Sequence, residues 1–110
     1  MKAILTLEES AKLIDLGIDP KLSSKETFIF NKIFTLTDIL SILPKEIEYH
    51  HLDIEASNAG YHVSYMLWDS CDEAYHYMGA TERPELIDAL NSLLIWAIEN
   101  KYVTPKQEKK

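Results

Sequence analysis

The longest helical pattern in the chain runs from Pro84 to Asn100, with the sequence PELIDALNSLLIWAIEN. At about 100° per residue, its apolar side chains cover an arc of roughly 200°, wider than the stripe of a surface helix. This predicts a helix that lies on a sheet and contacts other elements along both flanks. Pro84 suits the first turn, and the N-cap is expected at Thr81 or Arg83. Ile95 lies among polar positions, so we expect it to be exposed or, alternatively, to be an oligomer contact.

Two short helices are predicted in the N-terminal half. Thr6 and Glu9 form a capping box before an apolar pattern with helical spacing, which predicts a helix over residues 7–16. Thr35 begins a similar pattern, and Pro44 ends it because proline cannot continue a helix.

The first strand signals have irregular periodicity. The segment TFIFNKIF, residues 27–34, is rich in aromatic and β-branched residues, which is typical of a strand. A loop is expected before it, at residues 20–26. Residues 46–56 alternate between apolar and polar positions, with a slip of one residue near His50 and His51. A bulge or a short turn at that point would absorb the extra residue.

Three further segments, residues 52–56, 61–68 and 74–78, predict an antiparallel meander. Gly79 is expected to end its last strand. Pairing Ala56 with Tyr61 and Trp68 with Ala74 separates the side chains into two faces, as in sheets covered on one side. The face expected to meet the long helix carries Leu52, Ile54, Ala56, Tyr61, Val63, Tyr65, Leu67, Tyr75 and Tyr77. The outer face carries His51, Asp53, Glu55, His62, Ser64, Met66, Trp68, His76 and Met78.

These elements predict an α+β fold: an antiparallel sheet of three to four strands, packed on one face by the long C-terminal helix and two short helices. The chain has 110 residues and 46% hydrophobic content, enough for one domain with one core. We expect that domain over residues 1–104 and a frayed tail over 105–110. The N-terminal residues lack the long apolar run of a signal peptide, so a cytoplasmic protein without a membrane anchor is expected.

Charge is distributed unevenly along the chain. Residues 46–99 contain eleven acidic residues, a single Arg and all four histidines, whereas residues 100–110 contain four Lys and one Glu. A surface this acidic argues against direct binding to a nucleic-acid backbone and favours a basic protein partner. The simpler interpretation is a solvated surface that keeps a small protein soluble.

Candidate chemistry is confined to the outer face of the meander. A histidine beside a glutamate, as in Glu55 and His62, is an acid/base pair in some enzymes but more often a cross-strand pair. No zinc-protease or multi-cysteine spacing is present, so we expect neither a metal nor a cofactor. The acidic neighbours of Cys71 should raise the pKa of its thiol, which argues against a nucleophile. Exposed Trp68 and Met66 indicate a contact surface.

Three stretches, TLEESAKLIDLGIDP, FTLTDILSILPKEI and PELIDALNSLLIWAIENKY, resemble blocks in small uncharacterised proteins of Bacteroides-type gut bacteria and of their phages or mobile elements. The resemblance implies a self-contained domain, of the kind that accompanies mobile elements, and it carries over no catalytic residues.

The leading hypothesis is therefore a non-catalytic interaction module with no enzyme activity. Its partner-binding residues are predicted to be His51, Asp53, Glu55, His62, Met66, Trp68 and His76. Self-association through this face is an alternative. A second hypothesis is an acidic nucleic-acid mimic that inhibits a DNA-binding protein. A third is a small hydrolase or metal-dependent enzyme that uses His62, Glu55 and His76, which would require a concave pocket.

Overall fold

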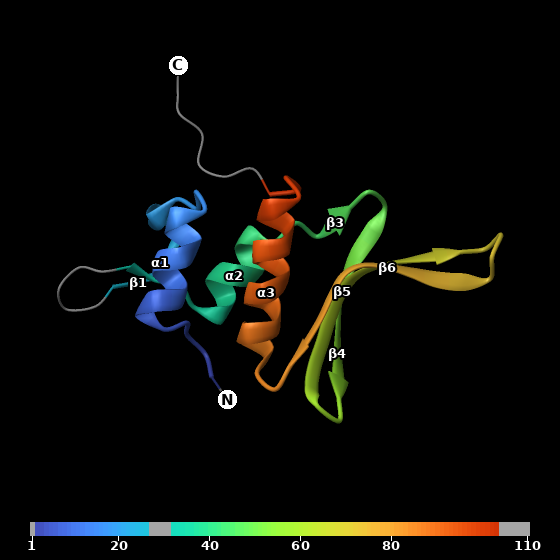
Figure 1. Cartoon of the computed structure of the whole chain (residues 1–110), viewed down its shortest axis with the longest axis horizontal. Coiled ribbons are helices and arrows are strands. Elements are labelled where there is room, and N and C mark those ends of the chain that lie inside the picture. The colour runs from blue at the N-terminus through green and yellow to red at the C-terminus, as the bar shows by residue number, and fades with distance from the viewer. Residues whose placement is uncertain (1, 27–31, 104–110) are drawn as a thin grey trace, which may run out of the picture.

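The computed structural model describes residues 2–26 and 32–103. Strands β3 to β6 form an antiparallel sheet in the order β3-β4-β5-β6, and β1 pairs with β2 separately, so the predicted α+β class is confirmed. Figure 1 shows α1 and β1 at one end, α2 and α3 between, and the sheet at the other end. The elements are α1 (Leu7–Asp15), the 3-10 turn η1 (Pro20–Leu22), β1 (Lys25–Glu26), β2 (Lys32–Ile33), α2 (Leu36–Ile42), β3 (Glu46–Ile47), β4 (His50–Ser57), β5 (Gly60–Asp69), β6 (Ala74–Arg83) and α3 (Leu86–Glu99).

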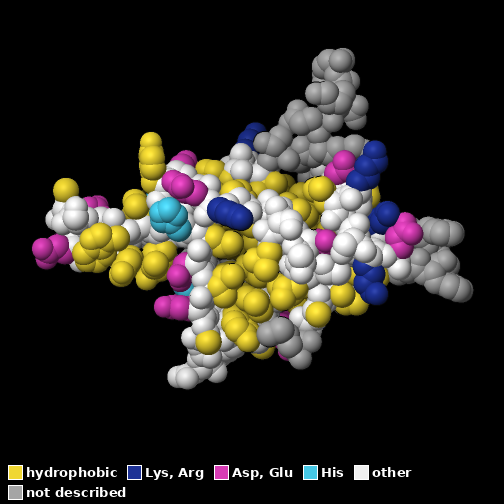
Figure 2. Space-filling model, turned by 180° about the vertical axis from the view of Figure 1, so that it is seen from behind, with side chains coloured by type: hydrophobic (Ala, Val, Ile, Leu, Met, Phe, Trp, Pro, Cys, Tyr) yellow, Lys and Arg dark blue, Asp and Glu magenta, His cyan; other side chains and the backbone are white. Residues whose placement is uncertain are grey.

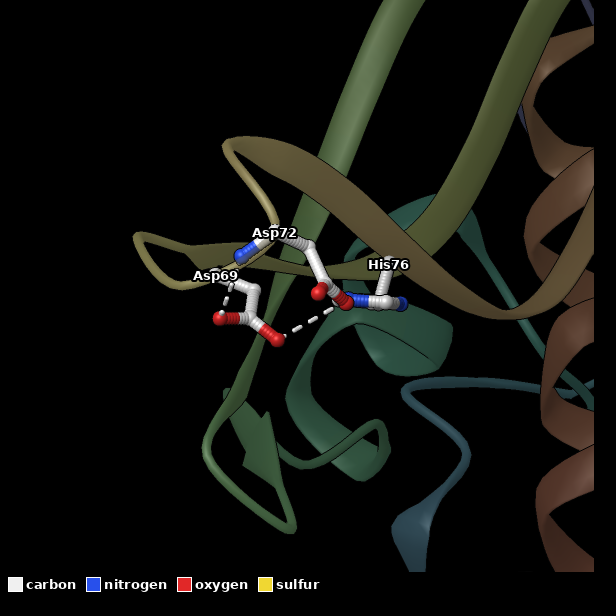
Figure 3. A group of neighbouring side chains, drawn as sticks. All are labelled: Asp69, Asp72 and His76. Carbon is white, nitrogen blue, oxygen red and sulfur yellow. Dashed lines mark hydrogen bonds and ion pairs between the residues drawn. The ribbon is translucent and has the colours of Figure 1, made fainter.

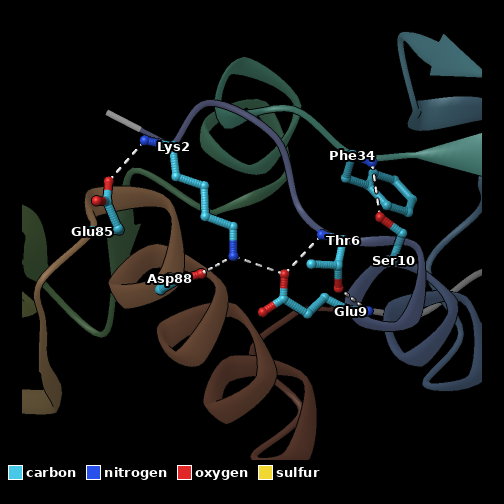
Figure 4. Close-up of polar contacts among 7 residues, drawn as sticks. All are labelled: Lys2, Thr6, Glu9, Ser10, Phe34, Glu85 and Asp88. Atoms are coloured by element: carbon cyan, nitrogen blue, oxygen red, sulfur yellow. Dashed lines mark hydrogen bonds and ion pairs between the residues drawn. The ribbon is translucent and has the colours of Figure 1, made fainter.

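Both short helices begin at the predicted capping boxes. The N–H of Glu9 donates to Thr6 Oγ1 at 3.1 Å, and the N–H of Thr6 donates to Glu9 Oε1 at 2.8 Å (Figure 4). Thr35 and Asp38 make the same reciprocal pair at the start of α2. These bonds satisfy backbone donors that have no partner within the helix, so sequence alone located both helix starts.

The long helix forms the centre of the core, as predicted. Two of the expectations about it are wrong. Its N-cap is Glu85, because Thr81 and Arg83 both belong to strand β6. Ile95 is half-buried and packs against the core, so the expectation of an exposed residue is wrong, whereas an oligomer contact through its exposed part stays a prediction. The wide apolar arc reflects contacts with α2 on one side and with β5 and β6 on the other.

The N-terminal strand prediction is only partly covered by the structure. Residues 27–31 lie outside the described residues, as does the tail predicted to fray, and β2 occupies the end of the predicted strand. The expected loop at residues 20–26 contains η1 and β1.

A tight turn explains the slip in the alternation of residues 46–56. Glu48 and Tyr49 have φ angles of 48° and 69°, and Ile47 pairs with His50 across them. Positive φ at both central residues is the signature of a two-residue hairpin turn. The predicted short turn is therefore present and lies just before His50.

The register between β4 and β5 is the predicted one, with Ala56 opposite Tyr61. The register predicted between β5 and β6 is wrong by one residue, because Trp68 pairs with Tyr75 and not with Ala74. Since successive side chains alternate between faces, this shift exchanges the faces of the first half of β6. Tyr75 and Tyr77 therefore share the outer face with Trp68. His76 and Met78 lie on the helix-facing side instead.

Strand β6 also continues to Arg83, past the predicted end at residue 78. Gly79 does not end the strand but lies at an irregularity where the register shifts between Val63 and Tyr65. Its φ is 64°, a conformation that glycine adopts without steric cost. A bulge of this kind bends a strand without ending it, which is why β6 can run from the hairpin tip back to α3.

The helix covers the middle of β5 and the second half of β6 but leaves part of β4 and the β5–β6 tip open. Val63 and Tyr65 are fully buried, and Tyr65 stacks on Trp96 of α3 with ring centroids 6.3 Å apart. Thr81 Oγ1 donates to the carbonyl oxygen of Ala89 at 2.9 Å, which ties β6 to the helix. Ile54 remains 42% exposed, so the expectation that the helix covers the whole meander is wrong at β4.

Candidate functional site

Four rings lie side by side on the outer face of β5 and β6, and we call them the aromatic row: His62, Tyr77, Tyr75 and Trp68. Their neighbouring ring centroids are 6.2, 6.5 and 4.9 Å apart in that order. Trp68, Tyr75 and Tyr77 are 51%, 52% and 54% exposed. Rings at such spacings stabilise one another in offset or edge-on geometries, so the row is an ordered surface although it faces solvent.

The row is exposed because it lies on the face of the sheet opposite to the side that packs on α3, and the hairpin that carries Trp68, Tyr75 and Tyr77 also extends beyond the helices. In Figure 1 the β5–β6 tip projects away from α3, and residues 74–77 are all exposed, whichever face they occupy. Figure 2 shows hydrophobic side chains along this projecting ribbon, with acidic groups at its tip. A small domain that keeps three large aromatic rings in water presents a surface suited to contact with another molecule.

The structure brings most of the predicted partner-binding residues together. Register pairs His51 with Met66, Asp53 with Ser64 and Glu55 with His62, so these residues share one face with Trp68, as predicted. His76 is the exception, because the shifted register places it on the opposite face. Sequence reasoning missed Tyr75 and Tyr77 for the same reason. The signal for them was the alternating sequence YHY at residues 75–77, but the prediction placed its two tyrosines on the helix-facing side.

The outer face shows no assembled acid/base machinery. Across the described ranges, no hydrogen bond joins His62 to Glu55 or Ser64 to Asp53, although each pair lies directly opposite in the register. Ser64 is fully buried, and its hydroxyl has no hydrogen-bond partner among those residues; the same holds for His62 Nδ1. His76, the third residue of the enzyme hypothesis, lies on the opposite face of the ribbon from His62. The predicted catalytic set is therefore not brought together.

A separate polar cluster lies at the tip of the hairpin (Figure 3). His76 Nε2 stands 3.2 Å from Asp69 Oδ2 and 3.4 Å from Asp72 Oδ2. The other oxygen of Asp69 accepts the N–H groups of Cys71 at 2.9 Å and Asp72 at 3.3 Å. These backbone bonds, together with His76, hold the pKa of Asp69 below its usual value. Sequence reasoning missed the cluster, although the spacing Asp-x-x-Asp-x-x-x-His across a short turn was a signal for it.

A hollow of about 440 Å³ lies beside η1, α2 and the residues after α3. Its lining includes no residue of the aromatic row or of the cluster at the hairpin tip. Its wall is mainly apolar, with Ile18, Ile42 and Val103 among the lining residues. The buried carboxylate in the wall is Asp38, which already accepts the N–H groups of Ser24 and Thr35 at 2.9 Å each. Although partial burial alone would raise the pKa of Asp38, these bonds hold it below its usual value. This carboxylate therefore serves the helix cap and is not free for catalysis.

No protein-family model matches the chain, and no curated protein or solved structure does so significantly. Within the described ranges, no helix has the length and apolar character that crossing a bilayer requires.

Proposed function

We propose that this protein is a non-catalytic interaction module that binds a protein partner through the aromatic row. The observation that carries the proposal is the ordered exposure of Trp68, Tyr75 and Tyr77 on a projecting ribbon. Trp and Tyr are enriched among the residues that supply most of the energy in protein interfaces. A rigid strand pair presents them at a low cost in conformational entropy.

The charge around the row indicates a basic partner. Asp53 and Glu55 lie on the same face in β4, and Glu82 lies opposite His62 in β6. Lys or Arg side chains of a partner would be attracted to these carboxylates and to the faces of the exposed rings. Charge of this kind contributes mainly to orientation and association rate, while the rings contribute the buried area.

Other classes have less support. A nucleic-acid mimic requires its carboxylates on one surface, yet Glu85 and Asp88 contact Lys2 beside α3, whereas Asp69 pairs with His76 at the hairpin tip. A hydrolase requires a catalytic set in a pocket, and His62 and His76 occupy opposite faces of the ribbon.

The test is affinity capture from cells of the source organism, followed by measurement of the dissociation constant with the purified partner. Trp68→Glu should weaken binding roughly 30-fold, equivalent to a loss of about 2 kcal/mol. Tyr49→Glu is the matched control, because Tyr49 is also an exposed aromatic residue but lies in the β3–β4 turn, outside the row.

Equal binding by wild type and Trp68→Glu, with both proteins folded by circular dichroism, would disprove the proposal. If the captured partner is a second copy of the chain, sedimentation should show a dimer for the wild type and a monomer for Trp68→Glu. That result would support the self-association alternative through the same surface and would contradict a basic hetero-partner.

A further inference from the structure

The cluster at the hairpin tip contains three metal-ligating side chains, two aspartates and one histidine, in and beside one turn. Asp69 ends β5, Asp72 lies in the turn, and His76 lies in β6. Asp69 pairs with Ala74 and Leu67 with His76 in the register, so Asp69 and His76 occupy the same face of the ribbon. The turn then folds Asp72 over them (Figure 3).

The donor atoms have the spacing of ligands around one ion. One nitrogen of His76 and one oxygen from each aspartate lie within 4.8 Å of one another, and two of the three separations are 3.2 and 3.4 Å. A point equidistant from three such atoms lies ~2.4 Å or less from each, close to the 2.0–2.2 Å of metal–nitrogen and metal–oxygen bonds. Movements of a few tenths of an ångström, well within side-chain flexibility, would complete the coordination.

The identity of the donors selects the class of ion. Calcium and magnesium take oxygen ligands almost exclusively, whereas an imidazole with two carboxylates suits divalent zinc, nickel, cobalt or manganese. The imidazole is what distinguishes this group from an ordinary cluster of surface acids. The net negative charge of residues 46–99 also raises the local concentration of cations.

The geometry of Asp69 is fixed before any ion arrives. Its Oδ1 is held by the two backbone N–H groups of the turn, so Oδ2 faces His76. Preorganisation of this kind lowers the entropic cost of binding. Without an ion, His76 Nε2 already lies beside one oxygen of each carboxylate, so the three donor atoms are gathered before binding.

We propose that the turn between β5 and β6 binds one divalent transition-metal ion through Asp69 Oδ2, Asp72 Oδ2 and His76 Nε2, with water completing the coordination. This site is independent of the aromatic row, because its ligands lie on the opposite face of the ribbon or in the turn. Either proposal can therefore fail without the other.

The test is isothermal titration of the full-length protein with Zn²⁺ at neutral pH. Wild type should bind one ion with a micromolar dissociation constant. His76→Gln and Asp72→Asn should each weaken binding by at least about tenfold. Both positions are exposed, so the variants should keep the wild-type circular dichroism spectrum. Titration with Mg²⁺ should give no comparable heat.

Two control variants separate this site from other metal-binding groups. His51→Gln removes an exposed histidine outside the cluster, and Cys71→Ser removes the thiol within the turn. Both should bind Zn²⁺ as wild type does. The absence of saturation at millimolar Zn²⁺, or equal affinity in wild type and His76→Gln, would overturn the proposal. Loss of binding in Cys71→Ser would also overturn it, because the thiol would then be the ligand.

Discussion

Gly79 lies directly against the indole ring of Trp96: a Cβ added at Gly79 would stand 2.6 Å from Trp96 Cε3. The absence of a side chain at this position lets β6 approach α3 closely at the point where the strand bends. The same residue has a φ of 64°, which any other L-residue adopts at a cost. Two independent constraints therefore require glycine in the middle of this strand.

Gly79→Ala should destabilise the fold by about 2–3 kcal/mol, because the new methyl group meets the Trp96 ring and the backbone becomes strained. Urea denaturation followed by circular dichroism would measure the change. Ala80→Ser, at the exposed neighbouring position, should change the free energy of unfolding by less than about 0.5 kcal/mol. Equal stability of wild type and Gly79→Ala would show that the close contact with Trp96 is wrong.

Tyr65 should make stability depend on pH in the alkaline range. Burial raises its pKa to about 12, whereas the phenol in the unfolded chain titrates near the ordinary value of about 10. The protonated phenol is thus favoured in the folded state, so its contribution is complete below pH ~10 and is lost between pH ~10 and ~12. Denaturation at several alkaline pH values should show a loss of up to about 2–3 kcal/mol.

Tyr65→Phe provides the comparison for that pH dependence. The variant keeps the ring that stacks on Trp96 but loses the bond that Tyr65 Oη donates to the carbonyl oxygen of Pro44 at 2.7 Å. At neutral pH we expect it to be less stable by about 1 kcal/mol. Its stability should fall less between pH ~10 and ~12 than that of wild type. Parallel pH curves for the two proteins would contradict the buried environment of Tyr65.

Ser10→Ala should destabilise the protein by about 1–2 kcal/mol. Ser10 is fully buried in α1, and its Oγ accepts the N–H of Phe34 at 3.1 Å (Figure 4). Alanine would leave that backbone donor buried without a partner, which costs more than the bond itself contributes. Denaturation in urea measures the difference, and exposed Ser70→Ala is the control that should remain near wild type.

Ser64→Ala should have the opposite outcome, although Ser64 is equally buried. Its hydroxyl finds no hydrogen-bond partner within residues 2–26 and 32–103. Removing the hydroxyl therefore removes the cost of its desolvation without breaking a hydrogen bond. The same urea experiment should give unchanged stability or a gain of up to about 1 kcal/mol. A loss as large as that of Ser10→Ala would mean that the Ser64 hydroxyl is satisfied by a group not identified above.

Lys2→Met should cost about 0.5–1 kcal/mol at low ionic strength. Lys2 Nζ joins two helices, since it lies 3.0 Å from Glu9 Oε1 and 2.8 Å from Asp88 Oδ1 (Figure 4). The bond to Asp88 is the main reason that the pKa of Lys2 is raised. Partly exposed ion pairs contribute modestly and are screened by salt, so the effect should shrink in molar NaCl. Lys12→Met, at an exposed position of α1, should show a smaller and less salt-dependent change.

The sequence by itself determined the elements whose signals are local. The capping boxes at Thr6 and Thr35 and the apolar arc of α3 depend on residues within a few positions of one another. For that reason they located the helices to within one or two residues. The register of β4 on β5 was also readable, because a four-residue turn connects strands whose helix-facing side carries Val63 and Tyr65, and both are buried in the structure.

Only the tertiary structure decided the faces of β6. Alternation reveals register where one face is buried, because a slip of one residue then exposes the core. In residues 74–77 both faces are exposed, so the sequence is compatible with either assignment of these side chains to the two faces. The projection of the hairpin beyond α3 and the bend at Gly79 placed Tyr75 and Tyr77 in the aromatic row and His76 beside Asp69. Both features depend on contacts with α3, such as that of Gly79 with Trp96, and local sequence patterns carry no record of such contacts.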